Sequence, residues 1–342
     1  MSDPRRPGLP VRAAVPLLLG GVAALALGSL LLGRYPIPPA QVVGILASRI
    51  LPWTRDWPDT MATVLLQVRL PRIAAALLVG GALASSGAAL QGLFKNPLVS
   101  PSILGVSAGA GFGAALGLLL SLPMPMIQAA AFLCGLLAVL ATLAIGRGFG
   151  TGSLTILVLA GIVVSALFSA LIALAKVVAD PVDKLPAITF WLLGSLAKAS
   201  GRDVLLVCAP VALSYLLLHG LRWQLNVMAL GEEEAMTLGV DGRRVMAGVI
   251  LATTLMTAAA VGISGMVGWV GLLIPHLARM LVGPAFPDVL PVSFLMGGGY
   301  LLLVDGLARG SGHGEIPLGV LTAIIGAPFF IFLLARMKRG GA

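Results

Sequence analysis

The chain has 342 residues, of which 58% are hydrophobic and only 10% are charged, and this composition excludes a soluble protein, which could not remove so much apolar surface from water. The apolar runs are long and unbroken, which favours membrane-spanning helices over the short alternating strands of a β-barrel. The net charge of +9 comes from residues in the loops between these runs, so we interpret it as a signal of membrane orientation and expect no nucleic acid partner.

The first apolar run, 13–33, follows three basic residues, Arg5, Arg6 and Arg12. This order resembles that of a secretory signal peptide, but the apolar core is longer than such peptides usually have. We therefore interpret the run as the first membrane span.

Residues 96–146 form a stretch of 51 residues without Asp, Glu, Lys or Arg. As one helix this stretch would be about 75 Å long, against roughly 30 Å for the hydrocarbon core of a bilayer. It must therefore cross the membrane twice, and Pro123 and Pro125 mark the turn between the two crossings.

Four glycines in this stretch, Gly105, Gly109, Gly113 and Gly117, recur at every fourth residue. They form a stripe of small residues on one helix face, which lets a neighbouring backbone approach closely. We expect tight packing inside one subunit. A subunit interface and a wall of a transport pathway are the alternatives.

Charge-free runs separated by turn residues predict ten membrane spans in a single transmembrane domain, 1–342. The eighth span is short, lies in Gly-rich surroundings and contains Pro275, which predicts a broken or half-length helix. The predicted spans are 13–33, 64–93, 101–121, 126–146, 154–176, 203–221, 244–263, 268–283, 289–308 and 316–335.

An even number of spans places both termini on one side of the membrane. The basic N-terminal residues and the C-terminal Arg336-Met-Lys-Arg339 indicate that this side is the cytoplasm. The long loops 34–63 and 177–202 then face outward, and the loop 222–243 faces the cytoplasm.

Motifs of enzymes and ion-driven carriers are missing or misplaced. Gly105–Gly109 matches GxSxG but lies in an apolar helix, and Gly262–Gly265 resembles the GxSG of intramembrane proteases without a suitably placed His. No metal-ligand spacing, mid-span acid or base, or P-loop occurs. We therefore expect no catalytic residue, no metal site and no permanently bound cofactor, and any uphill transport needs energy from another polypeptide.

Three segments together resemble one family in their order and spacing. They contain Arg69-Leu-Pro-Arg72, Gln91-Gly-Leu-Phe-Lys-Asn-Pro-Leu98 and Leu104-Gly-Val-Ser-Ala-Gly109, then Leu230-Gly-Glu-Glu-Glu-Ala-Met-Thr-Leu-Gly-Val-Asp241, then Gly271-Leu-Leu-Ile-Pro-His-Leu-Ala-Arg279, Asp305-Gly-Leu-Ala-Arg309 and Glu315-Ile-Pro-Leu-Gly319. They are similar to the FecCD-type permease subunits of ABC importers for siderophore iron, haem and cobalamin.

This resemblance implies an all-α polytopic membrane protein of type II ABC importer architecture, with about ten transmembrane helices per subunit. It implies a homodimer that binds two ATP-binding cassette subunits, which use the ATP, and one periplasmic substrate-binding protein. The complex would lie in the bacterial inner membrane, with both permease termini in the cytoplasm.

The loop 222–243 has the pattern of a short, stiff helix pair. Its three acids fall in a first helical turn, where they favour the positive helix end, Gly239 stands where a helix C-terminal glycine belongs, and Asp241 can cap the next helix. A solvated charged loop is the alternative. The resemblance assigns ATPase coupling to Gly231, Glu232, Glu233, Glu234, Ala235, Leu238 and Gly239.

Three arginines, Arg69, Arg72 and Arg309, stand at the outer ends of the second and ninth spans. By themselves they could be anchors that reach the lipid headgroups. The pattern of the family instead implies basic pockets that receive acidic residues of the binding protein, which would speed encounter and fix orientation.

A cytoplasmic gate is also implied by the resemblance. It would be formed by Asn96 and Leu98, after the second span, and by Ser153, Leu154 and Thr155, at the start of the fifth span, which lines the pathway. Relatives often have small hydroxyl residues at this start, and Leu154 departs from that pattern.

We therefore predict the permease of an ATP-driven importer that moves a large iron-containing or corrin cofactor from periplasm to cytoplasm, with haem as the first candidate. Ferric siderophores and cobalamin are the alternatives within the family. A secondary transporter without an ATPase is the alternative from another class, and transport that persists without a nucleotide-binding subunit would favour it.

Overall fold

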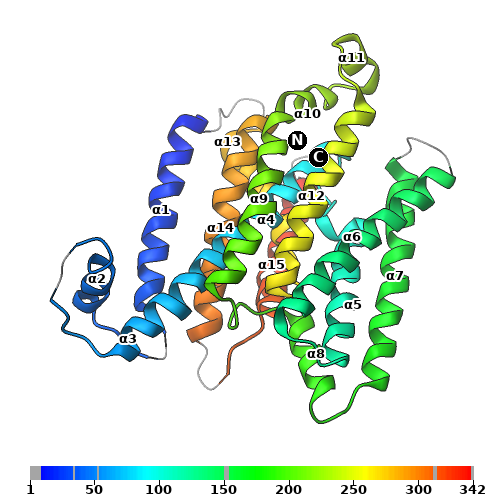
Figure 1. The fold of residues 1–342 in the computed structure, drawn as a ribbon. Helices are drawn as coiled ribbons and strands as arrows, with labels where there is room; N and C mark the ends of the chain where they lie inside the picture. The colour runs from blue at the N-terminus through cyan, green and yellow to red at the C-terminus, as the bar shows by residue number, and fades with distance from the viewer. Residues whose placement is uncertain (1–8, 34, 52–53, 150–153, 311–313, 340–342) are drawn as a thin grey trace.

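The computed structural model describes residues 9–33, 35–51, 54–149, 154–310 and 314–339, and every regular element in these residues is a helix (Figure 1). The elements are α1 (Val11–Leu31), α2 (Pro39–Ala47), α3 (Asp59–Thr63), the π-helix η1 (Val64–Arg69), α4 (Leu70–Leu93), the 3-10 helix η2 (Pro101–Leu104), α5 (Val106–Leu119), α6 (Met124–Gly148), α7 (Leu154–Val178), α8 (Lys184–Leu193), α9 (Gly201–Gly220), α10 (Arg222–Met228), α11 (Glu232–Thr237), α12 (Gly242–Ser264), α13 (Val270–Val282), α14 (Phe286–Gly310) and α15 (Leu318–Arg339).

A helix occupies each of the ten segments expected from the sequence. In the described part of the chain, seven helices are long and apolar enough to cross a membrane by length and composition: α1, the continuous helix Asp59–Leu93, α6, α7, α9, α12 and α14. α5, α8, α13 and the part of α15 that was searched are apolar but shorter. The expected short eighth segment is α13, which has 13 residues and begins after the left-handed Trp269.

The two long loops predicted from the sequence contain helices. α2 lies within 34–63, α8 lies within 177–202, and the second span begins at Asp59 because α3 and η1 continue directly into α4. Pro39 stands in the first turn of α2 and Pro58 directly precedes α3, where a missing N–H breaks no helical hydrogen bond.

The helix Asp59–Leu93 forms the centre of the bundle, with 83% of its apolar window buried. Its α4 part packs against α9, α12, α13 and α14. Glycines make these crossings close: a Cβ on Gly80 would lie 2.1 Å from the carbonyl oxygen of Gly297, and a Cβ on Gly87 would lie 1.9 Å from that of Gly271. Any larger residue would push α14 or α13 away from α4.

The predicted glycine stripe packs against α6 of the same chain. A Cβ on Gly109 would lie 2.4 Å from the carbonyl oxygen of Cys134, and a Cβ on Gly113 would lie 2.2 Å from that of Ala130. The prediction of tight packing inside one subunit is confirmed for these positions. Gly105 differs, because it precedes α5 with a left-handed φ of 85°.

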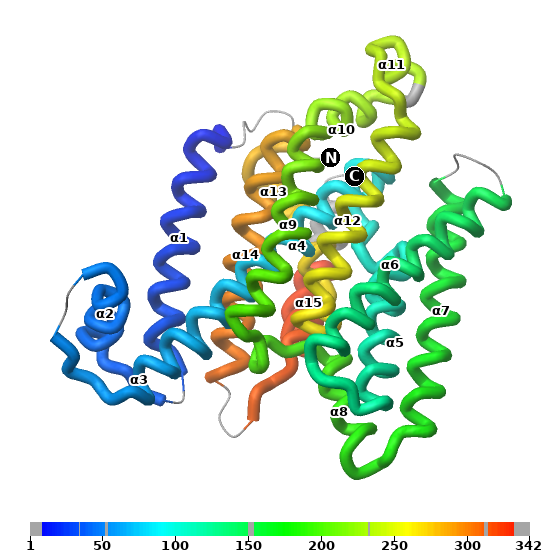
Figure 2. The backbone as a smooth tube through the Cα atoms, in the orientation of Figure 1, coloured from blue at the N-terminus to red at the C-terminus, as the bar shows by residue number. Residues whose placement is uncertain are grey.

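The bundle has two ends, which Figure 1 shows at top and bottom. α10 and α11 lie at one end, which we call the α11 face. The chain just before α1 meets the end of α13 there, through a hydrogen bond of 2.8 Å from the N–H of Leu9 to the carbonyl oxygen of Leu281. α2, α3 and α8 lie at the opposite end, which we call the α8 face. The tube in Figure 2 shows α1 and α2 on one side of the molecule and α7 on the other.

Candidate functional site

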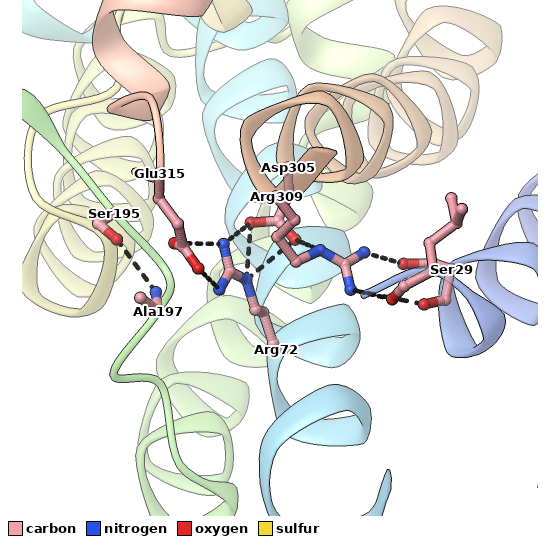
Figure 3. A network of polar contacts seen from close by, with 8 residues as sticks. Ser29, Arg72, Ser195, Ala197, Asp305, Arg309 and Glu315 are labelled. Atoms are coloured by element: carbon pink, nitrogen blue, oxygen red, sulfur yellow. Dashed lines mark hydrogen bonds and ion pairs between the residues drawn. The ribbon is translucent and has the colours of Figure 1, made fainter. Parts of the chain in front are cut away.

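Four charged side chains meet at the α8 face and form an ion cluster: Arg72, Asp305, Arg309 and Glu315 (Figure 3). Arg72 on α4 is central. Its Nε donates to the two carboxylate oxygens of Asp305 at 2.9 and 3.1 Å, and its Nη1 and Nη2 donate to those of Glu315 at 2.9 Å each. Arg72 is 5% exposed and Asp305 is 0% exposed, and such burial requires the charges to be paired.

Arg309 connects the ion cluster to α1. Its Nε lies 3.2 Å from Asp305 Oδ2, one helical turn earlier on α14. Its Nη groups donate to the hydroxyl of Ser29 and, at 3.1 Å, to the carbonyl oxygen of Leu32. The cluster therefore joins α1, α4, α14 and the segment before α15, and its two cations and two anions balance.

Arg69 is held differently. It is 4% exposed, and its guanidinium donates to the backbone carbonyl oxygens of Leu30 and Tyr35 at the end of α1. The family resemblance implies basic pockets at Arg69, Arg72 and Arg309 that receive acidic residues of the binding protein. In the structure all three guanidinium groups are hydrogen-bonded or ion-paired within the chain, as a charge at a packed helix end requires. The docking role of these residues stays a prediction.

The sequence did not identify Asp305 and Glu315 as ion-pair partners of Arg72 and Arg309. The spacing of Asp305 and Arg309 is i,i+4 within one helix, so this pair was available from the sequence alone. Arg72 and Glu315 are 243 positions apart, and no local pattern predicts that pair.

The helix pair expected in loop 222–243 is present as α10 and α11. Gly239 follows α11 with a left-handed φ of 77°, and the carboxylate of Asp241 caps α12 by accepting from the N–H groups of Arg243 at 3.0 Å and Arg244 at 3.2 Å. The predicted C-terminal glycine and the predicted cap are confirmed. The pair projects beyond the other helices in Figure 1.

The surface of this helix pair combines acids with exposed apolar side chains. Leu230, Met236 and Leu238 are 69%, 62% and 54% exposed, while Ala235 is buried. Glu233 and Glu234 are exposed. The side chain of Glu232 lies outside the described residues. Large apolar side chains on a projecting element are typical of a protein contact.

The predicted gate residues lie at the α11 face. The side chain of Asn96 accepts from the backbone N–H of Leu98 at 2.9 Å, which fixes the turn after α4 and leaves Leu98 55% exposed. Leu154 begins α7 and is half-buried, and Thr155 is exposed. Ser153 lies outside the described residues. The gate stays a prediction.

α7 presents an apolar face to its surroundings. Leu159, Val163, Leu167 and Val177 are each more than half exposed, and Phe190 on the neighbouring α8 is 65% exposed. In a membrane such a face contacts lipid or another apolar subunit.

Within the residues that the structure describes, no group of three or more His, Cys, Asp or Glu could hold a metal ion. The described residues form a bundle of apolar helices, seven of them long enough to cross a membrane, with a projecting helix pair at one end, and this architecture is that of a polytopic membrane protein. The chain belongs to the FecCD transport family, whose profile matches residues 21–336. It is an ABC importer permease subunit, which is not itself catalytic and which works with ATPase and binding-protein partners.

Individual relatives support this assignment. The chain is 41% identical over 325 residues to the molybdate import system permease protein MolB of Haemophilus influenzae, with 95% of each chain covered. It is 36% identical over 335 residues to the hemin transport system permease protein HmuU of Yersinia pestis, with 96% of each covered. A solved inward-facing transporter described as metal-chelate type is 39% identical, with a TM-score of 0.83 and coverage of 94% of this chain and 98% of that chain.

Proposed function

We propose that the α11 face is cytoplasmic and that α10 and α11 dock on an ATP-binding cassette subunit. The observation that carries this proposal is the exposure of Leu230, Met236 and Leu238 on a capped, projecting helix pair. ATP binding and hydrolysis on the partner would move α11, and the cap at Asp241 would transmit this movement into α12. Both chain termini then lie in the cytoplasm, in agreement with their basic residues.

The change Leu238→Glu tests this docking. A charge at the centre of an apolar contact should release the ATPase subunit, and co-purification with the permease should fall about tenfold or more. Leu120→Glu is the matched control, because Leu120 is 60% exposed and lies at the α8 face. Equal co-purification of both variants would contradict the proposed coupling surface.

The permease is proposed to act as a homodimer built through the α7 side. The apolar face of α7 with Phe190 of α8 would then line or flank the central pathway, as the family resemblance implies for the fifth span. Two permeases, two ATPase subunits and one periplasmic binding protein would form the complete importer in the bacterial inner membrane.

The binding protein is proposed to dock on the α8 face near the ion cluster. Arg309 is the cluster cation nearest to α1, and acidic residues of a binding protein could compete with Asp305 for it. Arg309→Gln should therefore weaken binding-protein affinity. If the variant loses thermal stability but binds the carrier as the unchanged permease does, Arg309 has a structural role and not a docking role.

The cargo is proposed to be a metal-containing species, with two candidates. Haem, the first candidate from the sequence, is supported by the apolar α7 face, which suits a large flat cofactor. Molybdate is supported by the 41% identity to MolB. Uptake of haem and of molybdate by the same reconstituted complex with its binding protein decides between them, since only the true cargo should accumulate and stimulate ATP hydrolysis.

A further inference from the structure

A cavity of about 520 Å³ opens at the α8 face between α2 and the first turns of the helix Asp59–Leu93. Arg49, Arg55 and Asp59 line this cavity, and Arg55 forms an ion pair with Asp59. Two guanidinium groups against one carboxylate leave a net positive charge. Trp57 lines the same cavity and is of the residue type that collects at membrane interfaces. We call this cavity the headgroup chamber.

A second cavity of about 330 Å³ lies between α1 and α4, and we call it the acyl groove. All of its lining residues are apolar: Ala23, Ala26, Leu27, Leu30, Leu70 and Ile73. It exists because α1 packs loosely, with only 17% of its apolar window buried. A gap of this kind on the periphery of a membrane bundle is filled by hydrocarbon.

The headgroup chamber and the acyl groove follow one face of the same helix. Leu66 lines the chamber and Leu70 lines the groove, so the two are separated by about one helical turn, or roughly 6 Å. The π-helix Val64–Arg69 lies at the junction, and such wide turns recur at functional sites. A polar, basic cavity at the end of the bundle is thus continued, deeper along the helix, by an apolar one.

We propose that the headgroup chamber and the acyl groove together bind one anionic phospholipid of the bilayer. Its phosphate lies between Arg49 and Arg55, and one acyl chain fills the groove between α1 and α4. Val43, Ile50 and Leu51, which are 61%, 87% and 57% exposed beside the chamber, contact neighbouring lipid. The bound lipid fastens α1 and α2 to α4.

The position in the molecule leaves this site open to the bilayer. α1 and α2 lie on the side of the molecule opposite α7 (Figure 2). The proposed dimer, built through α7, therefore does not cover the chamber. The statement that the dimer leaves the chamber uncovered rests on the proposed function. The lipid binding itself does not, because it is measured without transport.

The experiment is native mass spectrometry of the purified permease complex, titrated with palmitoyl-oleoyl phosphatidylglycerol. Each permease should retain one lipid. Arg49→Gln with Arg55→Gln should lower the affinity about thirtyfold, and Asp59→Asn, which raises the positive charge, should increase it about fivefold. Arg202→Gln is the matched control, an exposed arginine at the same face, and should change nothing.

Further measurements distinguish recognition of the headgroup from recognition of the acyl chain, and binding of a lipid from binding of a free anion. Ala23→Phe, which fills the acyl groove, should weaken binding of the long-chain lipid but not of dihexanoyl phosphatidylglycerol. The proposal is overturned if the double arginine variant binds as the unchanged protein does, if phosphatidylcholine with the same chains binds equally well, or if inorganic phosphate displaces the lipid at equal concentration.

Discussion

The ion cluster gives the sharpest prediction, because its central carboxylate has no contact with solvent. Asp305 is 0% exposed, accepts two hydrogen bonds from Arg72 at 2.9 and 3.1 Å, and lies 3.2 Å from the Nε of Arg309. Asp305→Asn keeps the shape of the side chain and removes its charge. The two positive guanidinium groups of Arg72 and Arg309 then lose the carboxylate that they share, and their mutual repulsion is no longer offset by it.

The size of the effect follows from which partners remain. Removing one partner of a buried ion pair costs about 3–5 kcal/mol, and Glu315 stays on Arg72, so we expect a loss near the lower limit, about 3 kcal/mol. For a chain of this size that corresponds to a fall of roughly 4 °C in the melting temperature. Glu315→Gln should cost less, about 1 kcal/mol, because the side chain of Glu315 is 30% exposed and the pair is partly screened.

The assay is thermal unfolding of the detergent-solubilised permease, followed by size-exclusion chromatography of the soluble fraction. The ranking is the test: Asp305→Asn must be clearly less stable than Glu315→Gln. Replacement of both Arg72 and Asp305 by apolar residues should lose less than the sum of the single changes, because each single change already includes the loss of the Arg72–Asp305 pair. Wild-type stability of Asp305→Asn would refute the reasoning.

Two further predictions concern packing and coupling. Gly113→Ala should lower the melting temperature by several degrees, because the added Cβ would lie 2.2 Å from the carbonyl oxygen of Ala130. Gly220→Ala is the control and should be neutral or slightly stabilising, because no heavy atom lies within 4 Å of its added Cβ. Equal effects of the two changes would contradict the α5–α6 packing. Asp241→Ala removes the cap of α12, worth about 1 kcal/mol, and should reduce cargo moved per ATP hydrolysed, while Asp241→Asn, which can still cap, should transport normally.

Local patterns were sufficient for much of this architecture. The period of four in Gly109 and Gly113 predicted a close helix contact, and the structure shows this contact with α6. Gly239 and Asp241 predicted the end of one helix and the start of the next, because caps depend on a few neighbouring residues. The apolar runs predicted where the long helices lie, since the bilayer sets their length.

Contacts between distant parts of the chain could not be predicted in the same way. The sequence places Arg72 and Glu315 at span ends but contains no signal that they pair, and the same holds for the approach of Gly80 to Gly297. α2 was not predicted, because the spans were predicted from long charge-free runs and α2, with 9 residues, is too short to cross a membrane. The sequence likewise contains no signal that Arg72 pairs with Asp305, 233 positions away, or that Arg69 donates to the carbonyl oxygen of Leu30.

Transport by reconstituted vesicles tests the central claim most directly, namely that this permease moves its cargo only when a separate ATPase acts on α11. Vesicles containing the permease, its ATPase subunits and the binding protein should accumulate cargo when ATP is present on the α11 side. Vesicles containing the permease alone should accumulate none, with or without an ion gradient. Accumulation against a gradient by the permease alone would contradict the account.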